Sequence, residues 1–154
     1  MTNDTTFYRW TKFKNGIGSV AIVTLDVEQN SFETNQILEH YSGQGFTSQG
    51  NIEEVPEDGY DSWKIAARQG LQYAFSLIDT HWTVHINKIE GLTTDTNPTI
   101  VGYTVLRAFF DKIHYHLSDE QIEKLEDFVL SSWTKPYKEL IPDFFNLTFT
   151  EFNG

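Results

Sequence analysis

The chain has 154 residues, about the size of one domain, and 39% of them are hydrophobic and 15% aromatic, so it can bury one core and is not a disordered segment. Its 22 acidic and 11 basic residues give a formal net charge of −11, a field that repels polyphosphates, and nucleic acid is therefore not an expected partner. Because the chain has no cysteine, it has no disulfide, no thiolate nucleophile and no cysteine-ligated metal.

The first predicted element is a β-hairpin. Residues 7–14 lean toward an alternation between two faces, and residues 18–27 form a β-branched run typical of a central strand. Asn15-Gly16 between them is a strong signal for a tight turn. A phosphate-binding loop is the alternative interpretation of residues 16–19, but a helix N-terminus does not follow them, so the hairpin turn is favoured.

The next segment has weaker patterns. Residues 28–45 are predicted to be a loop, with one short helical turn near residues 35–41 and a break at the glycines that follow. Residues 46–54 are the third predicted strand, and Gly50 indicates a bulge or a bend in it. Pro56 then ends this strand.

The midsection carries the strongest periodicity. Apolar residues recur at spacings of three and four over residues 60–78, which predicts a long amphipathic helix. Residues 81–89 alternate strictly and predict a sheet strand. A second long helix is predicted to begin after Asn97, whose side chain would cap it, with Pro98 at the first helical position.

The remaining residues are predicted to extend the same domain. Ser118 and Gln121 form a capping-box pattern that opens a third helix, running to about residue 132. Residues 137–149 are rich in aromatics, and covering the core is favoured over forming an exposed interaction surface. One domain is thus expected over residues 1–154, with a core at 7–115 and a helical extension at 116–154.

The order of these elements resembles domain IV of elongation factor G, the ribosomal translocase. The small residues Ala66, Gly70 and Ala74 are similar to an alanine and glycine pattern in the long helix of that domain. The resemblance covers roughly residues 7–115, and it rests on the segments 19–25, 65–74, 83–91, 94–97 and 105–110.

This resemblance implies the fold of ribosomal protein S5 domain 2. The expected class is α+β in two layers: about four strands, covered on one face by two long helices, with a left-handed βαβ crossover against the usual right-handed rule. The long glycine and arginine loop of the translocase corresponds here to the short residues 14–18. The resemblance therefore implies a fold, and association with the ribosome or with translation only by analogy.

Catalytic, cofactor and metal residues are not assigned. The weak candidates for a metal site or a small enzyme are the strand residues His81 and His85, Asp95 in the turn after them, and His114 and His116 after the second long helix. The sequence has no His-Glu-x-x-His or Gly-x-Ser-x-Gly motif, and its paired acids lie at turns and helix starts. The chain is therefore not expected to be an enzyme.

The leading interpretation is a non-catalytic protein-binding module with an acidic surface. Acidity steers the approach of a basic partner, and an immunity protein that neutralises a basic toxin is one version of this function. The N-terminus has no secretory signal pattern, and no apolar stretch approaches the roughly 20 residues that span a bilayer. A cytoplasmic location without a membrane partner is expected.

Overall fold

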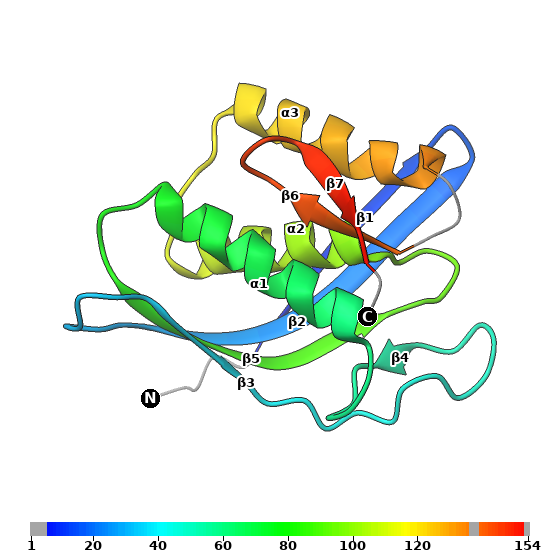
Figure 1. The fold of residues 1–154 in the computed structure, drawn as a ribbon, viewed down its shortest axis with the longest axis horizontal. Helices are drawn as coiled ribbons and strands as arrows, with labels where there is room; N and C mark the ends of the chain where they lie inside the picture. Colours follow the sequence, from blue (N-terminus) through cyan, green and yellow to red (C-terminus); the bar gives the residue numbers. More distant parts are fainter. Residues whose placement is uncertain (1–5, 136–138, 153–154) are drawn as a thin grey trace.

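The computed structural model describes residues 6–135 and 139–152, which form a mixed sheet with helices on one side of it (Figure 1). This is the α+β class predicted from the sequence. The elements in chain order are β1 (Phe7–Lys14), β2 (Ile17–Gln29), β3 (Gln36–Glu39), β4 (Glu53–Glu54), α1 (Asp61–Ser76), β5 (Trp82–Gly91), α2 (Pro98–Lys112), α3 (Asp119–Ser131), the 3₁₀ helix η1 (Ser132–Thr134), β6 (Leu140–Asp143) and β7 (Thr148–Glu151).

The predicted hairpin and the predicted central strands are confirmed. Strands β1 and β2 pair antiparallel, and β5 pairs antiparallel with the other edge of β2. The connecting turn places Asn15 at φ 55° and Gly16 at φ 78°, the left-handed values that a two-residue turn needs to match the twist of its strands. A register shift between Thr24 and Leu25 marks a bulge in the β2 and β5 pair.

The predictions for residues 28–54 were wrong in two places. Residues 36–39, expected in a loop or a helical turn, form β3, which pairs parallel with β5. Only Glu53–Glu54 of the predicted strand 46–54 is a strand, and it pairs antiparallel with the far end of β5. Both segments are short and take their conformation from hydrogen bonds to β5, a long-range effect that local patterns do not report. The chain passes from β3 through β4 and α1 to the parallel strand β5. This is the unit for which the left-handed crossover is predicted.

Helices α1 and α2 lie against each other with very little space between their main chains. Gly70 of α1 faces Gly102 of α2, and a Cβ on Gly70 would lie less than 3.0 Å from the Gly102 carbonyl oxygen. A Cβ on Gly102 would in turn lie 2.6 Å from the Ala66 carbonyl oxygen. The two glycines therefore set how closely the helices pack.

One face of the sheet packs against the helices, and the other face carries the more exposed side chains. Ala21, Val23 and Leu25 of β2 are buried, as are Val84 and Ile86 of β5. The alternate positions of β2 are only half-buried. This is the pattern of a sheet with one buried face.

The C-terminal part packs over the helices, as Figure 1 shows for α3 and for the hairpin of β6 and β7. The capping box predicted at Ser118 is present, with its hydroxyl accepting from the Gln121 backbone N–H. Phe144 is 2% exposed, which confirms that part of the tail covers the core, whereas Phe145 is 57% exposed. Residues 137 and 138 of the predicted tail lie outside the described residues.

Replacing Asn97 by alanine should lower the free energy of unfolding by about 1 to 2 kcal/mol. The Asn97 side chain accepts from the Ile100 backbone N–H, which confirms the predicted cap of α2, and its amide nitrogen donates to the Ser132 hydroxyl. The variant thus loses the cap and a contact to η1. Urea denaturation measures the change, and Asn51→Ala in an exposed loop is the control, expected within about 0.5 kcal/mol of the wild type.

Candidate functional site

A cleft of about 770 Å³ lies where the first turns of α1 and α2 meet the C-terminal segment. Of the residues that the structure describes, three acidic side chains line it, Glu53, Asp61 and Glu139, together with one basic side chain, Lys135. Four aromatic side chains also line it: Tyr60, Trp63, Trp133 and Phe152. The volume is in the range of ligand-binding pockets in general.

The local sequence explains how this cleft is built. Gly59 at φ 90° and Tyr60 at φ 56° turn the chain sharply between β4 and α1, so that the Tyr60 side chain reaches back to Glu53. On the other side, the Thr96 hydroxyl donates to the Val20 carbonyl and accepts from the Leu92 backbone N–H, which fixes the turn between β5 and α2. Two hydrogen-bonded turns therefore position the N-terminal ends of α1 and α2 at the cleft.

Glu53 is the central polar group of the cleft. The residue is only 4% exposed, and its Oε1 accepts a hydrogen bond of 2.6 Å from the Tyr60 hydroxyl. Its Oε2 accepts one from the Thr93 hydroxyl. Within residues 6–135 and 139–152, the ion pairs of the structure involve Glu39 and Glu126 but not Glu53. A buried carboxylate is usually paired with a cation, so it is unusual that the partners of Glu53 among the described residues are neutral hydroxyls.

Tyr60 is held in its protonated form. Burial and then the hydrogen bond to Glu53 raise the pKa of Tyr60 to about 12. Its ring meets the Trp63 ring edge to face, with centroids 5.1 Å apart. At neutral pH, Tyr60 is therefore a fixed hydrogen-bond donor to the carboxylate and part of the aromatic wall.

Alkaline pH should destabilise the protein. Burial is the main cause of a raised pKa in each of five tyrosines: Tyr8, Tyr41, Tyr60, Tyr73 and Tyr103. A raised folded-state pKa gives stability that is fully present below the ordinary pKa of 10.0 and is lost as pH rises through the folded value, which for Tyr60 is about 12. The free energy of unfolding should thus fall above pH 10.

Urea denaturation at a series of pH values, with tyrosinate absorbance recorded in parallel, measures this loss. In Tyr60→Phe the loss between pH 10 and about pH 12 should be smaller, because this variant has no Tyr60 hydroxyl to ionise. Equal pH profiles for the variant and the wild type would contradict the assignment of Tyr60.

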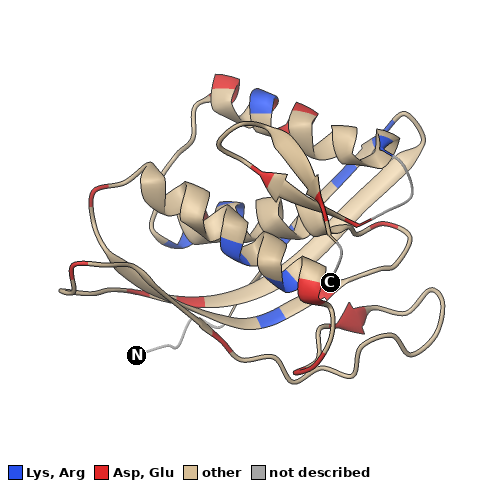
Figure 2. Cartoon of the chain, in the orientation of Figure 1, with Lys and Arg blue, Asp and Glu red and all other residues tan. Residues whose placement is uncertain are grey.

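Negative charge is concentrated beside the cleft. Residues 53–61 contain five acids and no basic residue: Glu53, Glu54, Glu57, Asp58 and Asp61. Figure 2 shows this concentration in red at β4 and at the start of α1. The next basic residue along the chain, Lys64, donates to the Glu57 backbone carbonyl over 2.8 Å. The approach to the cleft therefore favours a positively charged group.

The metal and enzyme candidates named from the sequence are dispersed in the structure. The His85 ring stacks on the His40 ring, with 2.9 Å between Nδ1 of His85 and Nε2 of His40. Asp95 follows the other end of β5, about 20 Å away at roughly 3.3 Å per strand residue. His81 stands just before β5, and its carbonyl accepts from the Asn30 backbone N–H.

The two remaining candidates lie in another part of the fold. His114 and His116 line a separate pocket of about 150 Å³ near the end of α2. In the described part of the chain, no three His, Asp or Glu side chains are grouped so that they could hold a metal ion. The five candidates therefore do not form one site.

The cleft residues were not predicted from the sequence, and the reason is physical. Trp133 and Phe152 line the same cleft as Glu53 but follow it by about 80 and 100 residues along the chain, so only tertiary folding brings them together. The acids of residues 53–61 are visible in the sequence, but turns and the dipole of the following helix account for each of them singly. Their high density over nine residues was the available sign of a site.

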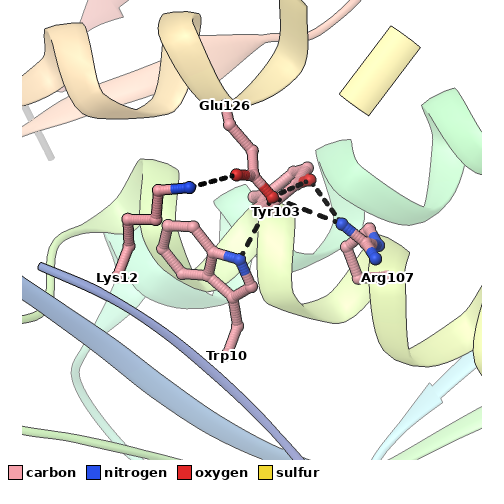
Figure 3. A network of polar contacts seen from close by, with 5 residues as sticks. All are labelled: Trp10, Lys12, Tyr103, Arg107 and Glu126. Atoms are coloured by element: carbon pink, nitrogen blue, oxygen red, sulfur yellow. Dashed lines mark hydrogen bonds and ion pairs between the residues drawn. The ribbon is translucent and has the colours of Figure 1, made fainter. Parts of the chain in front are cut away.

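A second polar cluster joins three elements and has a structural role (Figure 3). Glu126 of α3 accepts from the Tyr103 hydroxyl at 2.8 Å and from the Trp10 indole at 3.3 Å. It also pairs with Lys12 at 3.3 Å and Arg107 at 3.4 Å. Burial raises the pKa of Tyr103, which keeps this hydroxyl protonated. The cluster fastens α3 to β1 and α2.

No protein-family model matches this chain, and the search of curated proteins found no match either. No helix in the described ranges is long and apolar enough to cross a membrane.

Proposed function

We propose that this chain is a non-catalytic module that binds a basic partner protein through the acidic and aromatic cleft. The observation that carries the proposal is the composition of the described part of the cleft wall: three carboxylates and four aromatic rings against one lysine. Aromatic anchors in a desolvated pocket dominate the binding energy of many protein interfaces, and complementary charge guides the encounter.

The charge of the whole chain supports the same partner class. A net charge of −11 attracts a basic protein over a distance comparable to the Debye length and speeds association at low salt. Neutralisation of a basic toxin, as immunity proteins do, is the version of this function that uses such steering most directly.

The test compares two triple variants that lose the same charge in different places. The cleft variant carries Glu53→Gln, Asp61→Asn and Glu139→Gln, all at residues that line the cleft. The control carries Glu120→Gln, Glu123→Gln and Asp127→Asn, all exposed on α3. Each is used as bait in an extract of the source cells at low salt, and captured proteins are identified by mass spectrometry.

A basic protein captured by the wild type and by the control, but not by the cleft variant, is the expected result. Its affinity for the wild type should fall as salt rises, because long-range attraction is screened. Equal capture by all three baits would refute binding through the cleft. Capture of an acidic protein would refute the proposed class of partner.

A further inference from the structure

The carboxylate of Glu53 has unused hydrogen-bonding capacity. A carboxylate has about four acceptor positions on its two oxygens. Tyr60 occupies one on Oε1 and Thr93 occupies one on Oε2. Among the described residues, one acceptor position on each oxygen therefore remains, and a donor with two parallel N–H groups can occupy both.

Within residues 6–135 and 139–152, no cation pairs with this carboxylate. Among the described residues of the wall Lys135 is the basic one, and no ion pair joins it to Glu53. Its ammonium lies instead over the Phe149 ring, 5.6 Å from the ring centroid. A ligand that brings a positive charge into the cleft would balance the carboxylate.

The aromatic walls favour one kind of cation. An arginine guanidinium is planar, is weakly hydrated, stacks on aromatic rings and donates two parallel hydrogen bonds to a carboxylate. A lysine ammonium is a strongly hydrated point charge and cannot donate two parallel hydrogen bonds from a planar group. Tyr60, Trp63 and Trp133 in the wall suit the planar group.

We propose that the cleft is a receptor for an arginine side chain of the basic partner, which deepens the proposed function and rests on it. Glu53 binds the guanidinium with both oxygens while Tyr60 and Thr93 hold the carboxylate in place. Asp61 and Glu139 add negative potential at the same cleft. The aromatic rings cover the faces of the bound group.

The experiment titrates ¹⁵N-labelled protein with a short neutral-capped peptide, acetyl-Gly-Arg-Gly-amide. The indole N–H signals of Trp63 and Trp133 report on the cleft, because both residues line it. Trp10, which contacts Glu126, and Trp82, whose indole donates to Thr80, are internal controls outside it. Matched peptides with citrulline, which has the same shape without charge, and with lysine complete the series.

The arginine peptide should shift the signals of Trp63 and Trp133, and the other two peptides should bind at least about tenfold more weakly. Glu53→Gln should raise the dissociation constant about tenfold or more. Glu139→Gln leaves the hydrogen bonds of Glu53 intact and should raise it about two- to threefold. Glu123→Gln on the exposed face of α3 should leave it unchanged.

Unchanged Trp10 and Trp82 signals in Glu53→Gln show that the variant is folded. Citrulline binding as tightly as arginine, lysine binding as tightly as arginine, or no shift at Trp63 and Trp133 would each overturn the arginine receptor. If the cleft triple variant still loses the basic partner in those cases, the proposed function stands and only the arginine assignment fails.

Discussion

Replacing Gly70 by alanine should lower the free energy of unfolding by about 3 kcal/mol, although alanine is intrinsically the better helix former by about 1 kcal/mol. The new Cβ would lie less than 3.0 Å from the Gly102 carbonyl oxygen, which belongs to the main chain of α2. A main-chain atom cannot rotate away as a side chain can. Helices α1 and α2 would have to separate, and the core between them would lose packing.

Urea denaturation followed by circular dichroism measures this effect. Gln72→Ala on the exposed side of α1 is the matched control, and it should stay within about 0.5 kcal/mol of the wild type. A loss smaller than 1 kcal/mol in Gly70→Ala would mean that the two helices can separate without cost. The close glycine contact would then not define their packing.

Replacing Glu126 by alanine should cost about 3 kcal/mol of the free energy of unfolding. The side chain is 14% exposed, and its carboxylate contacts Lys12, Arg107, Tyr103 and Trp10. Its removal takes from the partly buried Arg107 the carboxylate with which it pairs. The Tyr103 hydroxyl and the Trp10 indole N–H lose the carboxylate oxygen to which they donate. Helix α3 would lose its polar attachment to β1 and α2.

The control for this prediction removes one partner from the edge of the same cluster. The Lys12 side chain is 42% exposed, so Lys12→Ala should cost less than about 1 kcal/mol. Glu126→Gln keeps an acceptor but loses the charge, and an intermediate loss is expected. If Lys12→Ala and Glu126→Ala were equally destabilising, the cluster would act through its surface ion pair rather than through its buried hydrogen bonds.

Several elements were predictable because their signals are local. Asn15-Gly16 defines the turn of the first hairpin, since its left-handed conformation favours these two residues. Asn97 with Pro98 begins α2, and Ser118 begins α3, because each side chain caps backbone N–H groups only two or three residues away. The predicted alternation of β5 holds at Val84 and Ile86, which are buried, but a register shift follows them and Ile89, expected on the other face, is buried as well.

The edge strands and the cleft depend on tertiary structure instead. Four residues of β3 fit a helical turn as well as a strand, and pairing with β5 decided between them. The pattern of Ala66, Gly70 and Ala74 was visible in the sequence, but only the structure shows that Gly70 faces Gly102.

The composition alone determined an acidic chain with one core and without cysteine chemistry. Only the folded chain brings Glu53, Tyr60, Trp133 and Phe152 into one cleft. Capping and turn formation act over a few residues and can be read along the chain, whereas a cleft depends on contacts between residues far apart in sequence.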